Sequence, residues 1–185
     1  MDFLAVAITG GIILLLLVLV LSYFIKTGNT MERLKVKIRE AESGIDVALT
    51  KRFDTLTKLL DSVWGFTKHE QETILQTIQL RQNMSIPQRA QVEQQLAEAQ
   101  KQINVLAEAY PALTSQAVFV QLQNAAMDTE EHLQAARRLY NANVSTLNQM
   151  VVSFPSSVVA ATKNIQQLSM FEAEAHKRAD VSLQM

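Results

Sequence analysis

The 185-residue sequence contains no cysteine, three prolines and five glycines. Without cysteine the chain can form no disulfide, thiolate metal site or cysteine nucleophile, an absence that fits a reducing compartment. Scarce proline and glycine beside abundant alanine, glutamine and leucine are typical of helices. No stretch alternates apolar and polar residues between turn signals, as a half-buried strand would. We therefore expect an all-α protein.

Residues 3–25 form an uncharged apolar segment. About 20 apolar residues, each rising about 1.5 Å, cross a bilayer core. A soluble core helix would present a polar face, and Thr9 and Ser22 are too few to make one. A cleaved signal peptide needs a basic start and a small-residue cleavage site, and this segment has neither. We predict an uncleaved transmembrane helix over 3–25, with the lipid bilayer as its partner.

No basic residue precedes this segment, and five follow it closely: Lys26, Arg33, Lys35, Lys37 and Arg39. This asymmetry predicts a single-pass protein of the cell inner membrane, with residues 1–2 outside and the remaining chain in the cytoplasm. The same cations are candidate contacts for anionic lipid headgroups, at about 1 kcal/mol each when close to the surface. A lipid-surface sensor is therefore one alternative function.

Apolar residues recur at three- and four-residue spacing through the rest of the chain, which predicts long amphipathic helices. Gly28-Asn29-Thr30 is interpreted as a break, with Thr30 capping a first helix that runs to Met84. Ser85, Pro87 and Gln88 have the spacing of a capping box that starts a second helix.

Prolines mark the remaining boundaries. Pro111 ends the second helix, because proline disfavours a helical conformation in the residue before it. A third helix is expected from Thr114 or Ser115 to Phe154-Pro155, and a short fourth over about 157–165 with Ser156 as its cap. The prediction is an elongated antiparallel bundle of three long helices plus a short fourth. Its expected parts are a basic stalk (26–44), a bundle domain (45–168) and a flexible C-terminal tail (169–185).

The second helix is too short to cover the whole first helix, which leaves an apolar stripe of the first helix uncovered. This stripe comprises Ile38, Ala41, Ile45 and Leu49. Either the third helix runs alongside, or two copies pair as a coiled coil. We expect the pairing, and hence a homo-oligomer, because tethering in one plane raises the local concentration. A second apolar group lies at the end of the third helix, and we expect the fourth helix to bury it. This group comprises Val151, Val152, Phe154, Val158 and Val159.

Chemistry-bearing motifs are missing. His69-Glu70 fails as HExxH because Thr73 replaces the second histidine, and no nucleophile elbow or glycine-rich phosphate loop occurs. No catalytic residue, cofactor or small-molecule substrate is therefore predicted. The formal net charge of −1 also gives no reason to expect a nucleic acid partner. The alternative is a metal-binding protein or metal-dependent enzyme that uses His69, His132 and nearby acids.

Several short blocks in order resemble the LemA family: Ile45-Asp46-Val47, Lys51 to Asp54, Lys68-His69-Glu70, Leu106 to Pro111, Phe119 with Gln121 to Gln123, Asp128-Thr129-Glu130, Ala136-Arg137-Arg138, Tyr140-Asn141 and Phe154-Pro155. The resemblance covers about 45–155. It implies a single-pass bacterial envelope protein with a helical bundle and without an established enzyme activity. Relatives occur in magnetosome formation, and some are encoded near membrane metalloproteases. Thr57 stands where the family often has proline, which predicts a straighter first helix.

Together these features predict a non-enzymatic scaffold that self-associates or binds a membrane protein complex, such as a protease. Arg137, Arg138, Tyr140 and Asn141 are the polar residues expected to organise the bundle, through packing more than through partner contact. Phe154 and Pro155 complete the set of candidate interaction residues.

Overall fold

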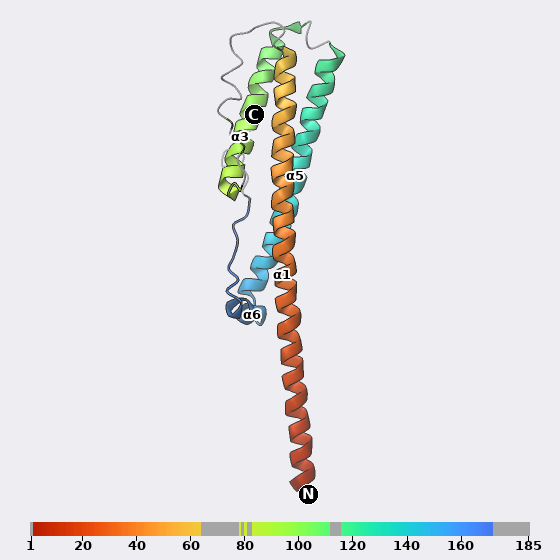
Figure 1. Ribbon diagram of the computed structural model, residues 1–185, viewed down its shortest axis with the longest axis vertical. Coiled ribbons are helices and arrows are strands. Elements are labelled where there is room, and N and C mark those ends of the chain that lie inside the picture. Colours follow the sequence, from red (N-terminus) through yellow and green to blue (C-terminus); the bar gives the residue numbers. More distant parts are fainter. Residues whose placement is uncertain (1, 64–77, 79, 81–82, 112–115, 172–185) are drawn as a thin grey trace, which may run out of the picture. The chain divides into compact units, whose positions relative to one another are not determined.

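The computed structural model describes residues 2–63, 78, 80, 83–111 and 116–171. These contain four helices, α1 (Asp2–Val63), α3 (Ile86–Glu108), α5 (Ala117–Val152) and α6 (Ser156–Thr162), as Figure 1 shows. No strand occurs within the described ranges, so the predicted all-α class is confirmed. The chain forms two compact units that share α1 and α5. The first comprises Met1–Arg39 with Ala142–Leu168, and the second comprises Glu40–Asn141 with Ser169–Met185.

The first unit joins the N-terminal part of α1 to the end of α5 and to α6. The beginning of α1 is long and apolar enough to cross a membrane, and no residue of its most apolar 18-residue stretch is buried within the protein. Asn164 adopts a left-handed conformation (φ 52°) after α6, and the Ile165 N–H donates to the Ala160 carbonyl at 3.0 Å. This Schellman-type end turns the chain out of the helix. The core of this unit contains Met31, Ile38, Val144, Leu147, Val159 and Ala160.

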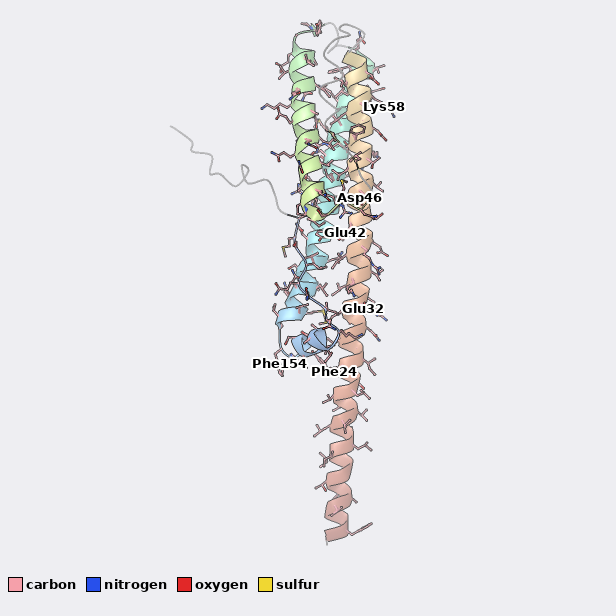
Figure 2. The ribbon with its side chains drawn as sticks, turned by 60° about the vertical axis from the view of Figure 1, so that its left-hand side comes forward. Phe24, Glu32, Glu42, Asp46, Lys58 and Phe154 are labelled. Atoms are coloured by element: carbon pink, nitrogen blue, oxygen red, sulfur yellow. The ribbon has the colours of Figure 1, made fainter. Side chains whose placement is uncertain are left out.

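The second unit packs α1, α3 and α5 side by side, as both views show (Figures 1 and 2). Apolar residues at helical spacing supply its core because each helix turns one stripe inward. α1 contributes Ile45, Leu49, Leu56 and Leu59, α3 contributes Val92, Leu96, Ala99 and Ile103, and α5 contributes Phe119, Ala126, Leu133 and Tyr140.

The predicted break after the apolar segment is wrong, because α1 continues through Gly28-Asn29-Thr30. Thr30 does not cap a helix; its Oγ1 donates back to the Lys26 carbonyl at 2.9 Å. Thr27 and Gly28 are buried, so tertiary packing surrounds the segment in which local signals favoured a turn.

The far end of the first helix also differs from the prediction. The described part of α1 ends at Val63, and residues 64–77 lie outside the described residues. Ile78, Asn83 and Met84 are not helical, so a helix that runs to Met84 is wrong. Asn83 has a φ of 59°, a left-handed conformation that asparagine tolerates and that is incompatible with a continuing helix.

Local signals located the second helix well. Ser85 and Gln88 form the predicted capping box, in which the Ser85 N–H donates to Gln88 Oε1 at 2.7 Å. The predicted start of the third helix at Thr114 or Ser115 lies outside the described residues. Ser156 is not a cap: Pro155 occupies that position, and Ser156 Oγ donates to the Ser153 carbonyl. The Phe154–Pro155 peptide bond is cis.

The stripe expected to pair two copies is already covered: Ile38, Ala41, Ile45 and Leu49 are at most 3% exposed within one chain. The long α5 runs alongside α1, which is the alternative arrangement that the helix lengths had left open (Figure 1). The argument for a coiled-coil homo-oligomer through this stripe is therefore wrong.

The expected burial of the second apolar group occurs only in part. Val159 is buried and Val151 is half-buried, whereas Val152, Phe154 and Val158 remain exposed. α6 is too short, at seven residues, to cover the corner at which it begins.

Candidate functional site

A bidentate ion pair joins α1 to the first turn of α3. Arg89 Nε and Nη2 donate to the two oxygens of Asp46, each at 2.7 Å, and Glu42 Oε2 lies 3.8 Å from Arg89 Nη1. Figure 2 labels Glu42 and Asp46 on α1. The hydrogen bonds that Arg89 donates to Asp46 raise the pKa of the buried Arg89 guanidinium, so it stays charged. A cation in the first turn of a helix opposes the helix dipole. The two carboxylates of α1 offset this unfavourable placement.

A second buried arginine connects all three helices of the second unit. Arg52 of α1 is 3% exposed; it forms an ion pair with Glu130 of α5, and its Nη2 donates to Gln100 Oε1 of α3 at 3.1 Å. Guanidinium groups suit such sites because their donors are held in a rigid plane. Removing one partner would leave a charge stranded in the core, so the triad specifies which helix faces meet.

Arg137 links α5 to α3 and to the chain that follows α6. It forms an ion pair with the buried Glu93, and its guanidinium lies over the Phe171 ring, 4.7 Å from the ring centre. Burial raises the pKa of the Glu93 carboxyl, and the positive charge of Arg137 partly opposes that rise. The cation–π contact adds attraction between Arg137 and a ring that is itself buried.

The side chains of α5 hold the returning chain through its backbone. The Tyr140 hydroxyl donates to the Ser169 carbonyl at 2.8 Å. The Asn141 amide donates to the Phe171 carbonyl at 2.8 Å and accepts from the Phe171 N–H at 2.7 Å. Residues 169–171 were predicted to begin a flexible tail, but these bonds and the burial of Phe171 fix them; residues 172–185 lie outside the described residues.

The same device appears within the first unit. The Asn148 amide donates to the Leu168 carbonyl and accepts from the Leu168 N–H, both at 2.9 Å. Asn141 and Asn148 stand seven residues apart on α5, which is two helical turns and hence one face. Two asparagines on α5 therefore each bind one residue of the extended chain as a neighbouring strand would.

The polar cluster of the second unit comprises Glu42, Asp46, Arg52, Arg89, Glu93, Glu130, Arg137, Tyr140 and Asn141. It joins helices rather than surrounding a space in which a substrate would react. A cavity of about 390 Å³ lies beside it, lined by Ile86, Pro87, Ala90, Ser169 and Met170, none of which titrates. Within the described ranges, no three His, Cys, Asp or Glu residues are grouped to hold a metal. His132 is exposed, and His69 lies outside these ranges.

Of the four polar residues named from the sequence, Arg137, Tyr140 and Asn141 lie in this cluster, whereas Arg138 is exposed. Sequence reasoning did not single out the other six members, Glu42, Asp46, Arg52, Arg89, Glu93 and Glu130. Two signals pointed to the arginines: Arg52 falls in register with the apolar stripe through Leu49 and Leu56, and Arg89 stands at a helix start where cations are unfavourable.

Comparison with known proteins identifies the family. The sequence profile of the LemA family matches residues 41–185. The chain belongs to the LemA family. Protein LemA of Metamycoplasma hominis is 27% identical over 177 residues, which span 92% of this chain and 81% of that relative. The family match extends beyond the 45–155 resemblance and contains every residue of the polar cluster, whereas the apolar segment precedes it.

Proposed function

We propose that this LemA-family chain is a non-enzymatic, membrane-anchored scaffold whose helical bundle binds other membrane proteins. One observation carries the proposal: a single unbroken helix supplies both the apolar segment and part of the bundle core. α1 begins in the uncharged residues and later contributes Ile45, Leu49 and Leu56. Such continuity suits a protein that holds a docking surface at a membrane, because no linker separates anchor from bundle.

The ionisable groups of the bundle support a structural rather than a chemical role. Each buried arginine has a carboxylate partner on another helix, and the arginine guanidinium does not deprotonate in proteins. General acid–base catalysis needs a titrating group that faces a bound substrate. The raised pKa of Glu93 arises beside Arg137 within the helix packing, so it does not mark a reaction site.

Partner binding would use the outward faces, since the inner stripe is covered. Each helix of the second unit exposes at least one large apolar side chain; examples are Val47 on α1, Val105 on α3 and Met127 on α5. We propose that such positions contact a membrane protein complex, such as a protease, or a second copy of the chain. The arrangement in the membrane would place residues 1–2 outside and the bundle in the cytoplasm, as the basic flank favours.

The lipid-sensor alternative is less well supported by α1. At about 1.5 Å per residue, Arg33 lies about 10 Å and Arg39 about 20 Å along the helix from Lys26. Attraction to anionic headgroups decays over a Debye length of about 8 Å at physiological salt. Because the helix does not break after Lys26, it carries Lys35, Lys37 and Arg39 away from the surface. Among these five cations, we therefore propose a headgroup contact for Lys26, which stands at the end of the uncharged segment.

Photocrosslinking in native membranes tests the scaffold. A photoreactive residue replaces Val47, Val105 or Met127 of the full-length chain, one per variant. A scaffold is expected to give a discrete protein adduct of constant mass from at least one face, and an adduct of two chain masses identifies a second copy. The matched control replaces Leu16 in the apolar segment, where lipid adducts are expected. Absence of protein adducts from all three helices contradicts the proposal, as would stoichiometric zinc, iron or manganese that His132→Ala removes.

A further inference from the structure

The corner between α5 and α6 exposes large apolar side chains in one place. Phe154 is 84% exposed, Val152 60% and Val158 45%. Single exposed apolar residues are normal on soluble proteins, but Phe154 and Val158 line one groove together with Pro155, so they form a shared apolar surface. Among the described residues, none covers these side chains, so the corner has room for a neighbour.

This corner lies against the apolar segment of α1, within the first unit. A groove of about 410 Å³ separates them, and its lining consists of Leu19, Val20, Tyr23, Phe24, Phe154, Pro155 and Val158. Figure 2 shows Phe154 at the corner and Phe24 on the adjacent stretch of α1. Four of the seven lining residues belong to the uncharged segment 3–25, so the apolar surface of the corner continues that of the membrane helix.

The depth of the contact follows from the helix rise. Lys26 marks the end of the uncharged segment. At about 1.5 Å per residue, Tyr23 lies about 5 Å and Leu19 about 10 Å below it. Interfacial amphipathic helices bury their apolar faces about 5–10 Å into the boundary between headgroups and acyl chains. The corner spans the same range.

A lysine follows α6 at the level where the uncharged segment of α1 ends. The Lys163 side chain crosses α1 at Gly28, where an added Cβ would lie 2.6 Å from Lys163 Cε. Gly28 follows Lys26 by two residues, so Lys163 and Lys26 stand at one level along α1. Two cations above an apolar corner, with Tyr23 in the groove below them, reproduce the distribution of charge and aromatic residues at membrane interfaces.

We propose that this corner is a second membrane contact: Phe154, Pro155 and Val158 insert among the lipid acyl chains of the leaflet nearer the bundle, and Lys163 meets the headgroups. The inference rests on the proposed anchoring by α1 and adds a monotopic insertion beside the transmembrane helix. Acyl chains also fill the groove between the corner and α1, which is lined almost entirely by carbon.

Depth-dependent quenching tests the insertion in the full-length protein. Because the chain has no cysteine, Phe154→Cys, Val158→Cys, Leu16→Cys and Met127→Cys each carry one environment-sensitive fluorophore. The variants are reconstituted in phosphatidylcholine and phosphatidylglycerol vesicles that contain lipids with a nitroxide at a shallow or a deep acyl position. Circular dichroism checks that each variant keeps its helix content.

The expected result is several-fold stronger quenching at residues 154 and 158 than at Met127, greatest with the shallow nitroxide. Leu16 is expected to respond most to the deep nitroxide, which reports the anchor itself. Quenching at residue 154 no stronger than at Met127, with Leu16 still quenched, overturns the insertion and leaves the anchor intact. Loss of quenching at Leu16 refutes the anchor. Disulfide-linked dimers of unlabelled Phe154→Cys at high lipid-to-protein ratio would show that a second copy covers the corner, and would also overturn the proposal.

Discussion

Asp46→Ala is expected to destabilise the protein more than Arg89→Met, although both break the same ion pair. Alanine at position 46 leaves the Arg89 guanidinium, 7% exposed, without its bidentate partner and with only Glu42 nearby, at 3.8 Å. Methionine at position 89 leaves the Asp46 carboxylate, whose side chain is 37% exposed and can be hydrated. The asymmetry follows from which charge is stranded in the bundle.

The magnitudes follow from the burial of each partner. Stranding a fully buried charge costs about 3–5 kcal/mol, and the partial exposure of Asp46 with the remaining Glu42 reduces this to about 2 kcal/mol for Asp46→Ala. Arg89→Met is expected to cost at most about 1 kcal/mol, because it retains an apolar stem and removes a cation from the first turn of α3. The double variant should match Arg89→Met, which gives a coupling energy of about 2 kcal/mol in magnitude, equal to the cost of Asp46→Ala alone.

Urea unfolding of the full-length protein in detergent micelles, followed by circular dichroism, measures these free energies. Lys101→Met, at an exposed position on α3, controls for the general effect of losing a cation. The reasoning is refuted if Arg89→Met costs as much as Asp46→Ala, or if the two changes are additive.

Three further changes test other parts of the molecule. Asn141→Asp is expected to cost about 1–3 kcal/mol and to speed proteolysis after α6, because its second oxygen would face a backbone carbonyl; exposed Asn124→Asp is the control. Gly44→Ala is expected to stabilise by about 1 kcal/mol, because an added Cβ meets nothing within 4 Å, whereas Gly28→Ala gains less because it displaces Lys163. Glu93→Gln is expected to become more stable relative to the parent as pH rises. The pKa of Glu93 is raised in the folded state. Between the ordinary pKa of 4.5 and this raised value, the folded parent binds more protons than the unfolded parent, so the parent loses stability as pH rises through this range.

Each of these expectations has a contrary outcome. Equal proteolysis of the two asparagine variants would show that the contact to the backbone of residue 171 does not hold the segment. A destabilising Gly44→Ala would show that this face of α1 is covered. A pH-independent difference between Glu93→Gln and the parent would show that the folded pKa is not raised.

Sequence signals of short range were reliable wherever one element decided the outcome. The capping box at Ser85 and Gln88, together with Pro111, bounded α3 because hydrogen bonds and steric clashes within four residues determine where a helix starts and stops. Signals were unreliable where distant segments compete with local preference. Gly28-Asn29-Thr30 favours a turn, yet it stays helical where the buried Gly28 contacts the side chain of Lys163, the residue that follows α6.

The sequence alone determined the helical class, the apolar segment and the amphipathic stripes, because composition and periodicity report on local backbone preference and on which face must leave water. Only the tertiary structure decided how those stripes were covered. Whether Ile45 and Leu49 face α5 or a second copy depends on where α5 lies, and the partners of Arg52 and Arg89 lie more than 40 residues away in sequence. The same holds for the corner at Phe154, which meets α1 near Tyr23 although 131 residues separate the two. Such pairings depend on the lengths and crossing of whole helices, which no local pattern records.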